Sequence, residues 1–424
     1  MYFRRIKIEN LKSIRHLAWE LPPQGQRAGW HVIIGDNGSG KSSFLRAVAL
    51  TLVGPQEIPA LRLDWGTWLR QDQNRGGVYL GVEQDRNVDE WKGKGRQRLG
   101  ILPVNLLFRR IEGEIELTTG SAAKRHVRGG KPGWFTAAYG PYRRFSGGDK
   151  DHEKLFYTHP RLARHLSVFG ETIALSECLR WLQDLRFKQL EKQPEGQLLG
   201  AITRFVNESH MLPQDAKLQE ANSEKVVFVD GNGFEIPVED LSDGFRSVLS
   251  MTFELIRQMA AVYGYDSLFD PENATTVRVP GVVLIDEIDA HLHPTWQRRV
   301  GLWFRKHFPN VQFLVTTHSP LICQAADVGS VFRLPTPGGR EKGRMLTGLE
   351  LERLLYGNIL DAYGTEMFGS DVTRSDESKL RMARLAELNQ RELHSGLSEH
   401  EKKEQEELRA ALPTASNNLT GTRA

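Results

Sequence analysis

The sequence predicts an α/β fold, and three patterns support that prediction. An apolar run at residues 30–34 leads into a glycine-rich turn and then a helical segment at 42–52. Two later runs, 282–285 and 311–315, are apolar throughout, which is typical of central parallel strands covered by helices on both faces. Between these parts, residues 78–140 contain short strand-like runs separated by glycine-rich turns.

The N-terminal strands come first along the chain. Phe3, Ile6 and Ile8 are separated by charged residues, which indicates a strand with one buried face, and a second short apolar run follows at 17–21. The strand at 30–34 and the helix at 42–52 then form a strand, glycine loop and helix unit.

The middle of the chain predicts a small β-rich layer and then helices. The strand-like runs of this layer are 78–82, 104–108, 111–117 and 134–139. Residues 172–210 read as mainly helical. A hairpin follows, in which 226–229 and 234–238 flank a glycine-rich connection.

The C-terminal half returns to α/β character and ends in charged helices. A second helix begins near Ser242, before the two apolar strands. From about residue 375 the pattern predicts a helical hairpin of 376–393 and 398–411, the second helix opened by a capping box at Ser398 and Glu401. We find no internal repeat.

Composition excludes several classes of protein. The 424 residues are 39 % hydrophobic and carry a net charge of +3, which excludes a chain that is disordered throughout. No apolar run approaches the roughly 18–20 residues that span a bilayer, and the N-terminus carries charges where a signal peptide needs apolar residues. We therefore expect a cytoplasmic protein without membrane association. Cys178 and Cys323 supply neither a disulfide framework nor a thiolate zinc site.

A phosphate-binding loop is the strongest chemical signal. Residues 35–42 match G-x-x-x-x-G-K-[ST] between an apolar strand and an amphipathic helix. Glycines let backbone N–H groups surround a phosphate, the lysine bridges phosphates, and the hydroxyl at the helix start reaches Mg²⁺. The predicted nucleotide-binding residues are Asn37, Gly38, Ser39, Gly40, Lys41, Ser42 and Ser43, with Ser42 also a Mg²⁺ ligand.

Acidic residues and a histidine follow the two apolar strands. Asp286 and Glu287 close the first strand, and their side chains point to opposite sides of its end. Asp286 can hold Mg²⁺, while Glu287 can polarise the attacking water as a base. His318 follows the second strand, where it can donate a hydrogen bond to the γ-phosphate in the transition state. The loop and the acidic pair together predict a nucleotide-hydrolysis site.

Leu241-Ser242-Asp243-Gly244 at the start of a helix is by itself a good N-cap. In the order phosphate loop, LSDG, acidic strand end and histidine, however, the chain resembles the ATP-binding-cassette (ABC) ATPases, in particular the SMC/Rad50/RecF-like branch. The resemblance covers about residues 1–55 and 240–335. It implies an ABC-type ATPase head that binds ATP and Mg²⁺ in a head-to-tail dimer, with Ser242, Gly244 and the D-loop position Asp289 acting in trans.

The sequence patterns and the resemblance together predict four parts of the chain. The expected parts are an N-terminal ATPase lobe with a basic β-rich insertion, a mainly helical insertion, a C-terminal ATPase lobe, and a helical extension with a disordered tail; their bounds are 1–150, 151–225, 226–335 and 336–424.

The chain departs from this family pattern in several places. Gln71, Gln73 and Gln84 are all candidates for the glutamine that bridges the lobes. The residues after Gly244 do not complete the transporter signature LSGGQ, and a long heptad array and a C-x-x-C zinc hook are both missing from the sequence. His291 and His293 form an H-x-H pair, which we interpret as structural because the segment resembles RecF-like ATPases that bind no metal there.

Basic residues concentrate in one segment. Residues 92–144 contain twelve Lys or Arg against three Glu: Lys92, Lys94, Arg96, Arg98, Arg109, Arg110, Lys124, Arg125, Arg128, Lys131, Arg143 and Arg144. This segment could bind the DNA or RNA backbone, or it could be a solvated surface or a patch for an acidic protein. Arg143 or Arg144 could alternatively reach a nucleotide phosphate.

Three biological roles remain open at this level. The compact head and charged tail resemble the ATPase subunit of Septu-type and retron-associated anti-phage systems, which implies a partner effector, in particular a separate nuclease. A RecF-like DNA-repair ATPase would instead bind DNA directly through the basic insertion. A membrane transporter ATPase is disfavoured by the LSDGF sequence and the lack of an apolar span.

Overall fold

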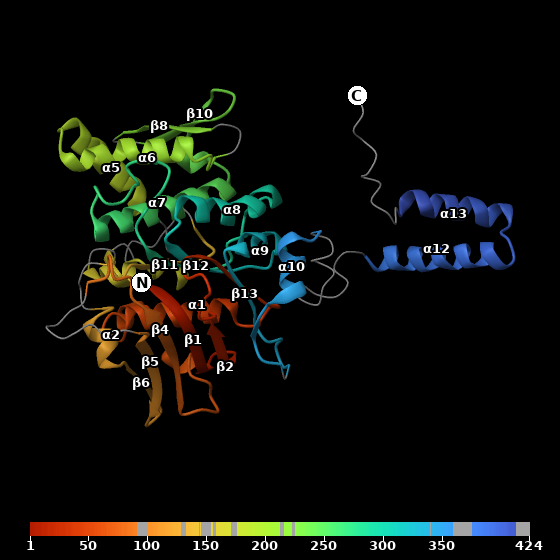
Figure 1. Cartoon of the computed structure of the whole chain (residues 1–424), viewed down its shortest axis with the longest axis horizontal. Coiled ribbons are helices and arrows are strands. Elements are labelled where there is room, and N and C mark those ends of the chain that lie inside the picture. The colour runs from red at the N-terminus through yellow and green to blue at the C-terminus, as the bar shows by residue number, and fades with distance from the viewer. Residues whose placement is uncertain are drawn as a thin grey trace. The chain divides into compact units, whose positions relative to one another are not determined.

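The computed structural model describes residues 1–90, 100–128, 133–143, 145, 154–155, 158–170, 176–212, 216–222, 225–339, 341–358 and 375–412. The chain divides into two compact units, Met1–Ile359 and Leu360–Ala424. The first unit contains three sheets and the helices around them, and the second contains a helical hairpin (Figure 1).

A five-stranded antiparallel sheet contains the N-terminal strands. Its order is β2 (Ile14–Glu20), β1 (Tyr2–Leu11), β4 (Arg75–Glu83), β5 (Leu102–Ile111) and β6 (Glu114–Thr118). Along β1, Ile6 and Ile8 are buried, while Arg5 and Lys7, which alternate with them, are exposed. The alternation in the sequence therefore correctly predicted a strand with one buried face.

A six-stranded sheet forms the centre of the molecule. Its order is β14 (Arg344–Met345), β13 (Gly329–Arg333), β3 (Gly29–Ile34), β12 (Val311–Thr316), β11 (Gly281–Ile285) and β7 (Thr136–Tyr139). The five strands from β13 to β7 are parallel, and β14 runs antiparallel to β13. Every residue of β11 and β12 is buried, which confirms that these are central strands.

The placement of residues 134–139 in the β-rich layer is wrong. Strand β7 pairs in parallel with β11, and Tyr139 lies opposite Ile285. The run is too short for its periodicity to identify its sheet, and its partner lies more than a hundred residues away along the chain. Because β7 ends beside β11, the loop at 140–143 lies at the edge of the sheet that carries Asp286.

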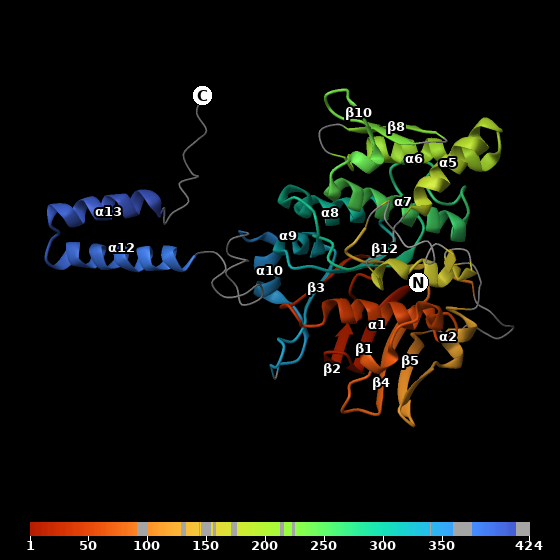
Figure 2. The ribbon, with the colours of Figure 1, turned by 180° about the vertical axis from the view of Figure 1, so that it is seen from behind.

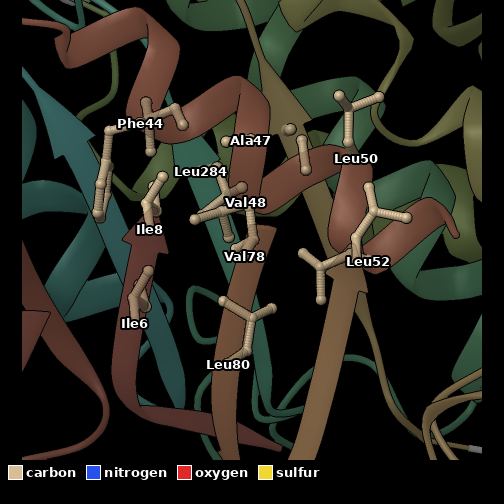
Figure 3. Packing of buried hydrophobic residues seen from close by; sticks show 14 of the residues in the cluster. Ile6, Ile8, Phe44, Ala47, Val48, Leu50, Leu52, Val78, Leu80 and Leu284 are labelled. Carbon is tan, nitrogen blue, oxygen red and sulfur yellow. The ribbon is translucent and has the colours of Figure 1, made fainter. Parts of the chain in front are cut away.

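Helix α1 (Lys41–Val53) lies between the two sheets (Figure 3). Val48 belongs to one buried cluster with Ile8 and Val78 of the antiparallel sheet and with Leu284 of β11. Burying an aliphatic side chain of this size stabilises a fold by about 1.5–3 kcal/mol. The core therefore fixes the helix that follows the phosphate loop from both sides.

Two helices cover the other face of the central sheet, α7 (Asp243–Tyr263) and α8 (Pro294–His307), as Figures 1 and 2 show. The indole ring of Trp30 in β3 stacks with Phe304 of α8 at a centroid distance of 6.2 Å. Both faces of the parallel sheet are thus covered, which explains why β11 and β12 are apolar throughout.

A smaller layer packs on α7 and α8. It consists of α5 (Glu177–Leu190), α6 (Gln197–Glu208) and a three-stranded sheet ordered β10 (Glu235–Pro237), β9 (Val226–Val229) and β8 (Lys217–Ala221). Phe205 of α6 packs edge-on against Trp303 of α8, whose indole N–H donates to the carbonyl oxygen of Ser209. The helices and hairpin predicted for this segment are confirmed.

The other helices in the described part of the first unit are short: α2 (Ser121–Arg125), α4 (Pro160–Ala163), α9 (Pro320–Cys323) and α10 (Gly348–Tyr356). Single 3-10 turns lie at Ile58–Leu61, Trp65–Thr67, Leu166–Val168, Pro194–Gly196, Val238–Asp240 and Gln324–Asp327.

The second unit is the predicted hairpin of α12 (Asp376–His394) and α13 (Glu399–Ala411). The capping box between Ser398 and Glu401 is present. Polar contacts join the two helices, since the guanidinium of Arg384 donates to both carboxylate oxygens of Glu404. Across the described residues of both units, we find no helix with the length and hydrophobicity needed to cross a bilayer.

Candidate active site

The phosphate loop connects β3 to α1 and depends on its glycines. Gly40 immediately precedes α1 with φ +97°, a backbone conformation that L side chains rarely adopt. A Cβ atom at Gly40 would also lie 2.8 Å from the Ser13 hydroxyl oxygen. Gly38 likewise has φ +78° and is exposed beside Asn37. The backbone N–H groups at the start of α1 are therefore presented by a turn that requires glycine.

Lys41 is the first residue of α1, and its side chain folds back over the loop. Its ammonium group donates to the carbonyl oxygens of Gly35 at 2.7 Å and Asp36 at 3.0 Å. Burial lowers the pKa of Lys41, while the carboxylates of Glu287, Asp286, Asp36 and Asp289 act in the opposite direction. The lysine is thus in the electrostatic field of the acidic residues that follow β11.

Thr316 at the end of β12 organises the acidic pair. Its hydroxyl donates to Asp286 Oδ1 at 2.6 Å and accepts from the backbone N–H of Glu287 at 2.8 Å. Glu287 has φ +45°, a left-handed conformation that is uncommon for a residue with a side chain. One threonine therefore orients the Asp286 carboxylate and supports an unfavourable backbone conformation at Glu287.

Asp289 connects the acidic loop to the segment that carries His318. One of its carboxylate oxygens accepts from the Thr317 hydroxyl at 2.6 Å, and the other accepts from the backbone N–H of His318 at 3.4 Å. The His318 side chain is exposed. Partial burial and the positive charge of Lys41 lower the pKa of His318, which favours the neutral imidazole at pH 7.

Two buried oxygen atoms in this cluster lack a hydrogen-bond partner among the described residues. They are Asp286 Oδ2 and the hydroxyl oxygen of Ser39. A buried carboxylate oxygen without a partner is costly unless a ligand satisfies it. The donor set suits Mg²⁺ and phosphate, because Mg²⁺ prefers carboxylate and hydroxyl oxygens and the loop offers backbone N–H groups. Ser42 and Ser43, in the first turn of α1, are half-buried.

A cavity of about 560 Å³ opens beside the phosphate loop. Gly38 and Ser39 line one part of it, Ser13 and the first residues of β2 line another, and Arg70 and the 335–339 loop complete it. Its contact with Ser39 makes it the place where the remainder of a nucleotide could extend from the loop. Gly38 and Ser39 were predicted from the phosphate-loop motif, but the other lining residues belong to no motif and were not predicted.

Ser242 and Gly244 lie in a different place from this cluster. Ser242 is the N-cap of α7 and makes no capping hydrogen bond with its side chain. A Cβ atom at Gly244 would lie 2.8 Å from the carbonyl oxygen of His291, so glycine is required by close packing. Both residues line a pocket of about 220 Å³ whose described lining includes no phosphate-loop residue. Within one chain, the structure therefore does not join them to Lys41.

The hypothesis that Arg143 reaches a nucleotide phosphate is wrong. Its guanidinium is buried and donates to the carbonyl oxygens of Gly140, Asp286 and Glu287 and to the hydroxyl of Ser247, at 2.9–3.1 Å. Burial lowers its pKa to about 10, and the carboxylates of the acidic loop oppose that shift. Arg143 reaches these acceptors because β7, the strand before its loop, pairs with β11, the strand before Asp286. Arg144 lies outside the described residues.

Some of the basic side chains in segment 92–144 are buried and are not part of its surface. Arg128 is buried and donates to the carbonyl oxygens of Thr51 and Leu52 at the end of α1. Arg109, Lys124 and Arg125 are exposed, and Arg110 is half-buried. Two of the twelve basic residues, Arg128 and Arg143, therefore have structural roles. Lys92, Lys94, Arg96, Arg98, Lys131 and Arg144 lie outside the described residues.

The other polar candidates have local partners. Gln84 donates to the carbonyl oxygen of Asp89, Gln73 accepts from Asn10, and Gln71 is exposed. His293 caps α8 by accepting from the backbone N–H of Thr295. Among the described residues we find no cluster of three His, Cys, Asp or Glu side chains that could hold a metal ion. Cys178 and Cys323 are both buried, and neither forms a disulfide.

Comparison with known sequences identifies two family matches. Residues 5–128 match a model described as "AAA domain", and residues 141–324 match one described as "AAA domain, putative AbiEii toxin, Type IV TA system". The chain is 26 % identical over 370 residues to "Septu protein PtuA" of Bacillus mycoides, which covers 86 % of this chain and 45 % of that protein. It is 36 % identical over 118 residues to "Retron Ec83 probable ATPase" of Escherichia coli, which covers 28 % of this chain and 20 % of that protein.

The chain therefore spans less than half the length of these two relatives. Among solved structures, an SMC head bound to the C-winged helix domain of ScpA superposes with a TM-score of 0.50 and 16 % identity, covering 83 % of this chain and all of that one. This likeness shows the fold. The phosphate loop, the acidic strand end and both matches agree: the chain contains segments that match AAA-domain models of ABC-like ATPases, has an SMC-head-like fold, and is homologous to Septu PtuA and the retron ATPases.

Proposed function

We propose that this chain binds Mg²⁺–ATP and hydrolyses it to ADP and phosphate. The observation that carries the proposal is the convergence of four side chains from three segments, Lys41, Asp286, Glu287 and His318. At this place a buried Asp286 oxygen has no hydrogen-bond partner among the described residues. Lys41 lies at the N-terminus of a helix that follows a glycine-rich loop, and carboxylates lie nearby. This combination of groups suits the transfer of a phosphoryl group to water.

Each residue has a distinct role in this proposal. Lys41 binds the β- and γ-phosphates through its ammonium group, and Ser42 and Asp286 hold the metal ion. Mg²⁺, when bound, supplies charge neutralisation to the phosphates. The Glu287 carboxylate takes a proton from the attacking water, and the neutral imidazole of His318 donates a hydrogen bond to the γ-phosphate.

Ser242, Gly244 and Asp289 would complete the site in trans. The Ser242 side chain makes no capping bond, and the start of α7 carries the positive end of a 21-residue helix. The Ser242 hydroxyl and the backbone N–H groups at the start of α7 can therefore contact a phosphate held by the loop of a second copy. A head-to-tail dimer with two ATP molecules between the chains provides that contact for both sites.

The biological role we propose is regulation of a partner effector, in particular a nuclease, within an anti-phage system. The support is homology to a Septu protein and a retron ATPase. Since the chain matches 45 % and 20 % of those proteins, the effector and its contacts are part of the proposal.

A DNA-binding role of the RecF-like kind is the alternative. It is supported by the exposed Arg109, Lys124 and Arg125 in the basic segment. This alternative predicts that the chain alone binds duplex DNA with an affinity that falls steeply between low and physiological salt. Salt-independent or undetectable binding would exclude it.

Hydrolysis is tested with Glu287→Gln and with Asp266→Asn, a change at an acidic residue remote from the site in the sequence, as the control. ATP binding should persist in Glu287→Gln while phosphate release nearly stops and an ATP-bound dimer accumulates. Wild-type turnover in Glu287→Gln would remove Glu287 as the base.

Copurification tests for an effector. The Glu287→Gln variant is expressed with its neighbouring genes and purified with ATP, and a nuclease that copurifies would support the proposed role. Recovery of DNA without a protein partner would favour the alternative.

A further inference from the structure

Arg143 joins two parts of the site that belong to different segments of the chain. Its Nε donates to the hydroxyl of Ser247 in α7 at 2.9 Å. Its Nη1 donates to the carbonyl oxygen of Asp286 at 2.9 Å, and its Nη2 donates to that of Glu287 at 3.1 Å. A single planar guanidinium therefore connects α7 to the backbone of both acidic residues.

The contact on α7 is close to the end of the helix that carries the LSDG residues. Ser247 is 1 % exposed and lies about one helical turn after Gly244. Because α7 is a continuous helix from Asp243 to Tyr263, a displacement at its first turn also displaces Ser247. The Arg143 guanidinium is bonded to the Ser247 hydroxyl and therefore experiences that displacement.

The contact on Glu287 is at a residue whose backbone has an uncommon left-handed conformation. Glu287 adopts φ +45°, and conformations of this kind persist only where the surroundings impose them. Thr316 accepts from the Glu287 N–H, and Arg143 donates to the Glu287 carbonyl oxygen. The peptide groups on both sides of the Glu287 side chain are thus fixed by these two residues.

The chemistry of arginine suits this arrangement. Its guanidinium presents five N–H donors in a rigid fork, whereas a lysine ammonium is a flexible point charge. The four acceptors of Arg143 come from three segments of the chain, namely the loop after β7, the acidic loop and α7. Lysine at this position cannot reach all of them with the same geometry.

We propose that Arg143 is a positioning residue that couples the LSDG end of α7 to the backbone of Glu287. Contact of Ser242 and Gly244 with a phosphate in the second copy is transmitted through Ser247 and Arg143 to the carboxylate that activates water. Hydrolysis is thereby tied to formation of the dimer. This inference rests on the proposed ATPase function.

The test separates turnover from binding with a matched pair of serines. Ser247→Ala removes the bond from α7 to Arg143 and leaves the bonds to the acidic loop. Ser250→Ala is the control, because Ser250 is also buried in α7. Among the described residues its hydroxyl bonds only within the helix, to the Ser247 carbonyl oxygen. In Ser247→Ala we expect kcat to fall about ten-fold or more, with KM and the equilibrium affinity for ATP within about two-fold of wild type.

Arg143→Lys provides a second variant, with Arg128→Lys as its control. Arg128 is also a buried arginine that donates to carbonyl oxygens, but at the far end of α1. In Arg143→Lys we expect kcat to fall while the affinity for ATP is retained. In Arg128→Lys we expect kcat to stay at the wild-type value, although its melting temperature changes by about as much as that of Arg143→Lys. Wild-type kcat in Ser247→Ala and Arg143→Lys, or equal losses in the controls, would overturn the inference. If wild type itself does not hydrolyse ATP while folded, the proposed function fails instead.

Discussion

The hydroxyl of Thr316 donates to the carboxylate of Asp286 over 2.6 Å, and this is the only hydrogen bond that the described residues provide to that carboxylate. Asp286 is 1 % exposed, so its orientation depends on this bond. Neighbouring parallel strands β11 and β12 bring the two residues together at the carboxyl edge of the sheet. Asp286, which we propose as a Mg²⁺ ligand, is therefore oriented by the strand that leads to His318.

Thr316→Val should impair both stability and metal-dependent turnover. The change is nearly isosteric but leaves the buried carboxylate without a donor, which costs about 1–3 kcal/mol of unfolding free energy. The Mg²⁺ concentration that gives half-maximal turnover should rise, because Asp286 is no longer oriented. Thr316→Ser keeps the hydroxyl and is the control. Urea unfolding and a Mg²⁺ titration check both effects, and equal behaviour of the two variants would exclude this role for Thr316.

Lys41→Ala should reduce ATP affinity by about ten- to hundred-fold or more, since charge-assisted hydrogen bonds contribute about 1.5–3 kcal/mol. Equilibrium binding of a fluorescent ATP analogue measures the loss. Lys7→Ala is the control, because Lys7 lies on β1 and pairs with Glu9. Retained affinity in Lys41→Ala would show that the loop does not bind the phosphates of ATP.

The stability of the fold should fall below pH 6.5 because of His31. Its imidazole is fully buried between the Ser330 hydroxyl and the carbonyl oxygen of Arg27, and burial lowers its pKa from 6.5 to about 4. The folded state then binds fewer protons than the unfolded state between these pH values. This contribution to stability is present above pH 6.5 and is lost as the pH falls towards 4.

Unfolding free energies of wild type and His31→Gln across this pH range test that expectation. The wild-type curve should decline more steeply, by up to about 1.4 kcal/mol per pH unit for one such group. His16→Gln, at an exposed histidine of β2, is the control and should keep the wild-type slope. Identical slopes in all three proteins would contradict a neutral buried His31.

The sequence predicted those parts of the fold whose patterns are local. Alternation identified β1, and uninterrupted apolar runs identified β11 and β12 as central strands. The four residues of β7 were assigned to the wrong sheet because a short buried strand has no distinctive period and its pairing is non-local.

The candidate site was predictable where residues belong to a motif. Lys41, Asp286 and Glu287 were identified that way, and the structure places them in one electrostatic cluster. Thr316 precedes the predicted histidine by two positions, so the rule that adjacent parallel strands end together could have found it. Arg143 was misinterpreted, since only the pairing of β7 with β11 shows that its guanidinium faces carbonyl oxygens.

The composite site between two copies is the central claim, and mixing two inactive variants tests it most directly. Ser242→Arg blocks the LSDG end, and Lys41→Ala disables the phosphate loop, so each variant alone should be inactive. After subunit exchange at equal amounts, about a quarter of wild-type turnover should return, because about half of the dimers are mixed and each contains one complete site. An inactive mixture, with exchange demonstrated by differently tagged subunits, would contradict a site shared between two chains.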